Sequence, residues 1–223
     1  GSGRADVGLR CISAALFRSQ GVRHSTQVCL SFEASGHTLE VSGALARGLV
    51  PDQDRLAVRV RTGLDSLLAE NFKAPDPVKD PEAWCKHDIR GFQARKRSTL
   101  KLLKALLQAK ESRDLHQGFG RVVMIVLTAD GMPVAEACRQ IRSGPPLAGV
   151  VTVVGDHRGS TDDQISAYCG VAEEVGAEVL HVSVGGDTLL ASHAIVILTH
   201  YFDEMMHRCE VAQQVDYGRG SGR

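Results

Sequence analysis

The sequence predicts an α/β protein with a mostly parallel sheet flanked by helices. Three short apolar runs, residues 122–127, 150–154 and 179–184, have the length and composition of buried strands. The segments between them, residues 134–142 and 162–175, have helical patterns. Apolar strands that alternate with helices form a parallel sheet covered on both faces.

The N-terminal half predicts further elements in order along the chain. Apolar residues at helical spacing predict a helix over residues 9–20, which Gly21 ends. Residues 26–32 and 37–41 predict two strands, joined as a hairpin by residues 34–36. Pro51 and Asp52 open a helix that continues to residue 68, and Ser98 caps another that continues to residue 107.

Between these helices the composition predicts an insertion. Residues 71–87 hold three prolines among mixed charges, which is typical of an irregular surface loop. A concentrated basic segment follows over residues 88–97. We therefore expect one domain over residues 1–223, with 71–97 as an inserted loop and 120–210 as the cofactor-binding half.

Charge and cysteine content narrow the classes of function. Lysine plus arginine and aspartate plus glutamate balance at 26 each, so any nucleic-acid partner must be recognised by local charge. The 6 cysteines form no C-x-x-C pair, which favours free thiols and no metal site. No run approaches the roughly 18 apolar residues of a membrane helix, so we expect no membrane association.

The three predicted strands end in polar or glycine-bearing residues, at 128–131, 155–159 and 185–187. Because parallel strands end at the same edge of a sheet, these loops are expected to form one pocket. The chain has no G-x-G-x-x-G motif that opens a helix, no P-loop motif, and no lysine after residue 120. This pattern favours S-adenosylmethionine over ATP, with a ligand-free strand-to-helix corner or a Rossmann-like nucleotide site as alternatives.

Two motifs about 150 residues apart resemble a known family. The C-terminal motif is Gly155-Asp156-His157-x-Gly159, Ser183-x-Gly185 and Leu189-Leu190-Ala191-Ser192-His193; the N-terminal motif is Gly1-Ser2-Gly3-Arg4-x-Asp6, Arg10-Cys11, Ser13-Ala14-Ala15-Leu16-Phe17 and Gly21-Val22-Arg23. These residues resemble the knotted SPOUT methyltransferases, and within them the TrmY family, which methylates N1 of pseudouridine-54 in tRNA. The resemblance spans nearly the whole chain.

The resemblance implies a deep trefoil knot within residues 120–210, an exception to the rule against knots. It also implies bound S-adenosylmethionine and a homodimer in which both subunits build each active site. The implied cofactor contacts are Leu127, Gly155, Val184, Gly185, Gly186, Asp187, Thr188, Leu189 and Ala194. The family commonly has Cys where this chain has Ala194, and it usually has a strand ahead of the position of Gly1.

The resemblance also implies the catalytic residues. Asp6 is expected to accept the N1 proton, and Arg4 or Arg10 to position a phosphate or stabilise charge on the base. The alternative is that Asp6 caps the first helix and pairs with Arg10 on the surface. For tRNA contact we expect Arg18, Arg23, Arg90, Arg95, Lys96 and Arg97, although a solvated charged face is the usual meaning of such a run.

The expected location is cytoplasmic, with an organelle as the alternative. Two other functions remain open within the same fold. One is a methyltransferase that acts on another RNA such as ribosomal RNA. The other is a catalytically inactive member of the family that binds RNA.

Overall fold

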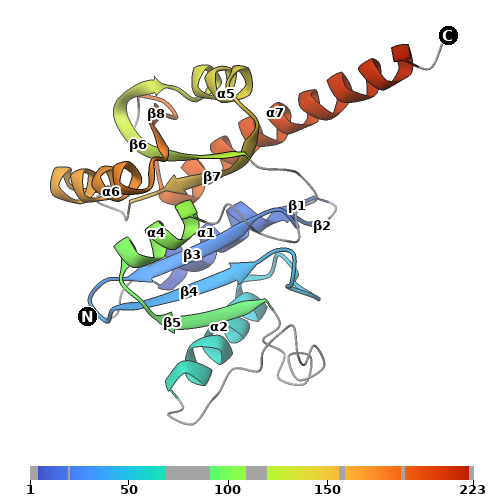
Figure 1. Ribbon diagram of the computed structural model, residues 1–223. Helices are drawn as coiled ribbons and strands as arrows, with labels where there is room; N and C mark the ends of the chain where they lie inside the picture. Colours follow the sequence, from blue (N-terminus) through green and yellow to red (C-terminus); the bar gives the residue numbers. More distant parts are fainter. Residues whose placement is uncertain are drawn as a thin grey trace. The chain divides into compact units, whose positions relative to one another are not determined.

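The computed structural model describes residues 5–19, 21–68, 91–108, 120–155, 159–186 and 189–220. The chain divides into two compact units, residues 1–102 and 103–223, each described by itself (Figure 1). The single domain predicted over residues 1–223 stays a prediction. No helix in these described ranges is long and apolar enough to span a membrane.

The first unit is built on a three-stranded antiparallel sheet. Its strands are β3 (Gln27–Phe32), β4 (His37–Ser42) and β5 (Phe92–Lys96), in the order β3-β4-β5. Helix α1 (Ala5–Leu16) packs on β3, and α2 (Gln53–Leu68) packs on β5 and on α1. A separate two-stranded ribbon joins β1 (Phe17–Arg18) to β2 (Gly21–Val22).

The predicted hairpin is confirmed. Phe32 lies opposite His37, and the amide of Gly36 donates to the Phe32 carbonyl at 2.9 Å. Gly36 adopts a φ of 66°, a left-handed conformation that a residue with a side chain rarely takes. Leu39 and Val41 of β4 are fully buried, together with Ile12 of α1, Leu56 of α2 and Phe92 of β5.

The second unit contains the predicted parallel sheet. Strand β6 (Arg121–Pro133) lies between β7 (Leu147–Val153) and β8 (Glu178–Ser183) and pairs parallel with both. The connecting helices are α5 (Val134–Ser143) and α6 (Asp162–Val175), close to the predicted bounds. Helix α7 (Ala191–Gly220) follows β8, and α4 (Thr99–Gln108) precedes β6.

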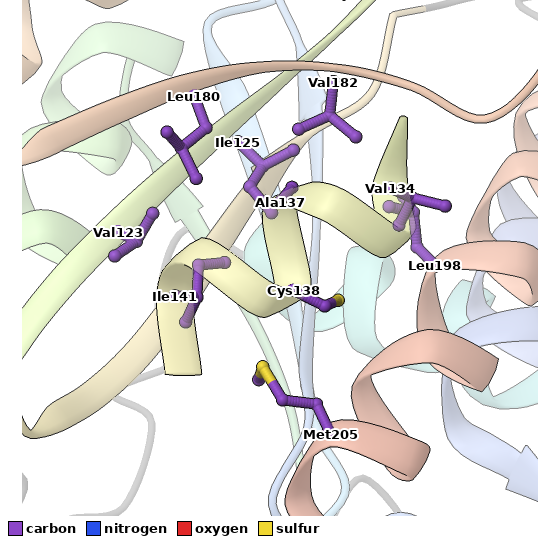
Figure 2. Close-up of a cluster of buried hydrophobic side chains, with 10 residues drawn as sticks. All are labelled: Val123, Ile125, Val134, Ala137, Cys138, Ile141, Leu180, Val182, Leu198 and Met205. Carbon is purple, nitrogen blue, oxygen red and sulfur yellow. The ribbon is translucent and has the colours of Figure 1, made fainter. Parts of the chain in front are cut away.

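The central strand β6 is buried on both faces, as its continuous apolar sequence predicts. Val123 and Ile125 face α5 and α7, in the cluster drawn in Figure 2 with Ala137, Ile141 and Leu198. The alternate residues of β6 face α4 and α6, in a second cluster that contains Val122, Met124, Val126, Leu103, Leu107, Tyr168 and Ala172. Because successive strand residues point to opposite faces, one apolar run supplies both cores.

Three predicted boundaries are wrong. The helix predicted over residues 9–20, with its end at Gly21, spans Ala5–Leu16. The helix ends early because Phe17 and Arg18 form β1, which pairs antiparallel with Gly21 and Val22. Residues 92–96 were predicted as part of an inserted loop, but they form β5, which pairs antiparallel with β4. The segment lacks the alternation of a half-buried strand, because Phe92 is buried, Gln93 and Ala94 are half-buried, and Arg95 and Lys96 are exposed. The rest of the predicted insertion, up to residue 90, lies outside the described residues. Strand β6 was expected to end at Leu127, but it continues to Pro133.

Candidate functional site

The carboxyl ends of the three parallel strands meet at one edge of the C-terminal sheet. Val126 of β6 lies opposite Val153 of β7, and Leu127 lies opposite Val182 of β8. The chain therefore leaves all three strands at the same edge, through residues 128–131, 154–160 and 184–190. This confirms the predicted convergence of the three loops, which is where open α/β sheets bind ligands.

The first of these segments is a wide bulge within β6. Leu127 and Met132 both pair with Val182, so residues 128–131 are displaced from the ladder. Gly131 permits this path, because a Cβ there would lie 2.6 Å from the Val182 backbone. Bulges of this kind are frequent beside active sites, where they redirect side chains.

The bulge holds a polar atom that the sequence interpretation did not select. The Thr128 hydroxyl oxygen is buried, and among the described residues it has no hydrogen-bond partner. A buried hydroxyl without a partner is costly, and a ligand group at this edge would satisfy it. In the sequence, Thr128 is the first polar residue after the apolar run of residues 122–127, and this position could have identified it as a site residue.

The second segment folds sharply back on itself after β7. A Cβ on Gly155 would lie 2.4 Å from the carbonyl carbon of Gly159 and 2.6 Å from the amide nitrogen of Ser160. Only glycine permits Gly159 and Ser160 to come this close to residue 155. Asp156, His157 and Arg158 lie outside the described residues.

The start of α6 anchors the far end of this segment. The Thr161 hydroxyl accepts from the Gln164 amide at 3.3 Å, and the Gln164 side chain accepts from the Thr161 amide at 3.0 Å. This capping box satisfies two amides at the helix N-terminus and fixes where the chain enters α6.

The third segment follows β8. The Gly185 amide donates to the Ser183 hydroxyl at 3.3 Å, the hydroxyl donates to the Gly185 carbonyl at 3.1 Å, and Gly185 has a φ of 145°. Val184 is half-buried and Gly186 is exposed, whereas Asp187 and Thr188 lie outside the described residues. Helix α7 begins at Ala191, after the exposed Leu189 and Leu190, and Ala194 is buried in its first turn.

The groups at this edge fit an adenosine-bearing cofactor. Gly185 and Gly186 leave open space beside the main chain, the bulge supplies a hydroxyl without a described partner, and Leu127, Val184 and Leu189 supply apolar surface. Backbone N–H and C=O groups read the edge of a base, while apolar side chains cover its faces. The described cofactor candidates, Leu127, Gly155, Val184, Gly185, Gly186, Leu189 and Ala194, all belong to the C-terminal unit.

The catalytic candidates belong to the N-terminal unit. Asp6 lies in the first turn of α1, and its carboxylate accepts a hydrogen bond from Arg10 one turn later at 2.8 Å. The two side chains are 51% and 36% exposed, so the pair lies at the surface of its unit. The predicted surface pairing is present, and it is compatible with a catalytic role. Arg4 lies outside the described residues.

Several predicted RNA-binding residues interact within the chain. The Arg23 guanidinium donates to the carbonyls of Ala15 and Phe17 at 3.2 Å and 3.0 Å, where it stabilises the end of α1. The Glu40 Oε1 atom lies 3.5 Å from Arg95 Nε and 3.6 Å from Arg97 Nη1. Both contacts are ion pairs, and neither counts as a hydrogen bond. Arg18 and Lys96 are exposed, and Arg90 lies outside the described residues.

Comparison with protein families gives the identity of the chain at family level. A family model described as "Putative SAM-dependent RNA methyltransferase" matches residues 1–207. The chain belongs to this family. The predicted family and cofactor class are therefore confirmed, and the fitted edge of the C-terminal sheet belongs to an S-adenosylmethionine-dependent RNA methyltransferase.

Curated relatives and a solved structure agree with this family. A protein of Methanopyrus kandleri is 28% identical over 91% of this chain and 81% of its own length, and a protein of Methanosarcina mazei is 26% identical over 91% and 79%. Both are named tRNA (pseudouridine(54)-N(1))-methyltransferase. The fold resembles that of Nep1 from Archaeoglobus fulgidus, whose crystal structure contains S-adenosylhomocysteine, with a TM-score of 0.50, 12% identity and coverage of 92% of this chain and 72% of that one.

Proposed function

We propose that this methyltransferase transfers a methyl group from S-adenosylmethionine to N1 of pseudouridine-54 in tRNA. The observation that carries the proposal is the shared edge of three parallel strands, where the positions of a side chain on Gly185 and Gly186 are open space. The substrate is that of the relatives in Methanopyrus and Methanosarcina, which match most of the chain. A methyltransferase acting on another RNA is the alternative.

The cofactor is held by the loops of the C-terminal unit. Leu127, Leu189 and Ala194 would supply apolar contacts to the cofactor, and Gly155 with Val184, Gly185, Gly186, Asp187 and Thr188 would supply main-chain hydrogen-bonding groups. The Thr128 hydroxyl gains a partner in the ligand. Bound S-adenosylmethionine supplies an electrophilic methyl group on a sulfonium sulfur, so the protein mainly aligns the target and removes its proton.

Asp6 is the proposed base. Methylation of N1 would form an N–C bond as the methyl–sulfur bond breaks to leave a neutral thioether, S-adenosylhomocysteine. The imide N–H bond would also break, and the Asp6 carboxylate would accept that proton. The Arg10 guanidinium, 2.8 Å from the Asp6 oxygen, orients the carboxylate from the next turn of α1. Arg10, with Arg4, also stabilises negative charge on the base while its proton leaves.

The remaining expectations concern assembly. Each active site combines the cofactor edge of one subunit with Asp6 of its partner in a homodimer, and residues 120–210 form a trefoil knot. Arg18, Arg23, Arg90, Arg95, Lys96 and Arg97 contact phosphates of the tRNA, and among the described residues of this set Arg18, Arg95 and Lys96 are exposed. A cytoplasmic location follows from the tRNA substrate.

The test uses radiolabelled S-adenosylmethionine and two tRNA transcripts that differ only in whether residue 54 is uridine or pseudouridine. We expect label only on the pseudouridine-bearing transcript, and we expect Asp6→Ala to abolish it while cofactor binding persists. Equal labelling of both transcripts would refute the substrate assignment. Cofactor binding without transfer to either transcript or to ribosomal RNA would identify an inactive family member.

A further inference from the structure

A pocket in the N-terminal unit lies apart from every residue assigned above. It has a volume of about 230 Å³ and is formed by the loop after β4, residues 48–50, and by Arg55, Leu56, Val58 and Arg59 of α2. All of these residues lie within the first compact unit. The pocket is therefore a feature of one unit and does not depend on how the two units are arranged.

Two guanidinium groups line this pocket because of helical spacing. Arg55 and Arg59 are four residues apart, so they lie on the same face of α2. The Asp52 carboxylate accepts from the Arg55 amide at 2.8 Å and thereby fixes the start of the helix. One amino group of Arg59 lies 3.5 Å from the position of a Cβ on Gly48, which has a φ of 61°. The Arg59 side chain is thus held over the loop.

The rest of the lining is apolar, and all of it except the buried Leu56 is at least partly exposed. Val58 is 65% exposed, which is unusual for a large aliphatic side chain on an otherwise charged helix face. Leu49 and Val50 line the pocket from the loop. Guanidinium groups beside an open apolar wall suit a phosphodiester, because the cations contact the phosphate oxygens while the wall contacts the sugar.

We propose that this pocket binds a phosphodiester group of the RNA substrate. The proposal rests on the RNA substrate of the proposed function, and it adds Arg55 and Arg59 as phosphate contacts outside the basic segment of residues 88–97. It commits to RNA because the lining combines two cations with neutral walls, and no carboxylate is among the described lining residues. Such contacts fix the register of the RNA and carry no information about base identity.

The test is the salt dependence of binding for the double variant Arg55→Gln/Arg59→Gln. Fluorescence anisotropy with an unmodified tRNA transcript gives Kd between 50 and 300 mM KCl. Each phosphate contact that the protein makes releases counterions from the RNA. The double variant makes fewer such contacts, so we expect the slope of log Kd against log salt to fall by about 1 to 2. At the lowest salt the affinity should fall roughly tenfold.

Arg61→Gln is the matched control. Arg61 lies on the same helix, is exposed and carries the same charge, but it is not part of the pocket lining. We expect its salt slope to stay at the wild-type value. The variant Arg55→Lys/Arg59→Lys keeps both positive charges and should retain the wild-type slope. It therefore shows whether the loss in the glutamine variant comes from charge. Thermal melts verify that each variant folds.

Wild-type slope and affinity in the double glutamine variant, or an equal loss in Arg61→Gln, would overturn the inference. The double glutamine variant could instead keep the wild-type salt slope for RNA but lose binding to an acidic peptide. That result would assign the pocket to a protein partner and would also overturn the inference. Because the assay needs neither pseudouridine nor methyl transfer, its result is independent of the test of the proposed function.

Discussion

Gly155 illustrates how the absence of a side chain permits a tight loop at the proposed cofactor site. The chain turns so tightly after β7 that a methyl group there would overlap the backbone at Gly159 and Ser160, at 2.4 Å and 2.6 Å. Backbone atoms cannot move aside as the end of a flexible side chain can. The glycine is therefore required by the shape of the loop, although its φ is not in the left-handed region.

We predict that Gly155→Ala weakens S-adenosylmethionine binding at least tenfold and destabilises the fold by roughly 1–3 kcal/mol, as is usual when a core is overpacked. Calorimetric titration and urea denaturation measure the two effects. Gly170→Ala is the control, because a Cβ at that position in α6 meets nothing within 4 Å. That change should stabilise the helix by about 0.5–1 kcal/mol. Equal behaviour of the two variants would contradict the close approach at Gly155.

Thr128 gives a second prediction at this scale. Thr128→Val replaces a buried hydroxyl that lacks a partner in the described structure with a methyl group of similar size. The unliganded protein should gain about 1 kcal/mol in unfolding free energy, since the cost of the unsatisfied group disappears. The same change should weaken cofactor affinity. A variant that loses stability without cofactor would mean that the hydroxyl is already satisfied in the folded protein.

At the scale of elements, α6 matters through its first residues. Its capping box at Thr161 and Gln164 fixes the chain immediately after the cofactor loop, and Gly176, with a φ of 67°, ends the helix in a left-handed conformation. The helix is thus bounded at both ends by residues whose roles can be read from local chemistry. Its start also positions Gly159 and Ser160, which lie next to Gly155.

We predict that Thr161→Ala destabilises the protein by about 1 kcal/mol, the usual cost of losing an N-cap, and raises the Kd of S-adenosylmethionine. Urea denaturation and calorimetric titration detect these changes. Thr161→Ser keeps a hydroxyl in the same place and should behave like wild type. If serine and alanine proved equally harmful, the methyl group of Thr161 and not its hydroxyl would be responsible.

At the scale of the whole molecule, burial of thiols makes stability depend on pH. Burial raises the pKa of Cys11, Cys29 and Cys138, and for Cys29 burial and the nearby Glu40 together raise it to about 12. The unfolded chain loses these protons above about pH 9, where the folded chain keeps them. The stabilisation is therefore complete below about pH 9 and is lost as the pH rises towards the folded pKa values.

We predict that the unfolding free energy falls above pH 9 by up to about 1.4 kcal/mol per pH unit for each such thiol. Urea denaturation at pH 8, 9, 10 and 10.5 measures the slope. Cys29→Ala should make the slope shallower, because one of the three thiols is removed. An unchanged slope in this variant would show that other groups control the alkaline limb.

The proposed dimer makes a prediction about the whole assembly. A heterodimer of one Asp6→Ala subunit and one Gly155→Ala subunit, purified through two different tags, retains one intact site if each site is shared between subunits. We expect it to have about half the activity of wild type, since a symmetric dimer has two equivalent sites. Each homodimeric variant should be inactive. An inactive heterodimer would place Asp6 and the cofactor in the same subunit's site.

The sequence by itself determined the elements whose patterns are local. The continuous apolar runs of β6, β7 and β8, the helices α5 and α6, and the hairpin at Gly36 were all predictable because residue spacing and turn chemistry act over a few neighbours. The motifs around Gly155 and Ser183 likewise predicted the cofactor edge, since parallel strands end on one side.

Only the tertiary structure decided what depends on contacts distant in sequence. Residues 92–96 form β5 because β4 offers a pairing edge and Glu40 lies beside Arg95 and Arg97, some 55 residues away. The bulge at 128–131, the unsatisfied Thr128 hydroxyl and the pocket beneath Arg55 and Arg59 likewise arise from long-range packing. Local spacing specifies an element, whereas its partners are chosen by the free energy of the whole fold.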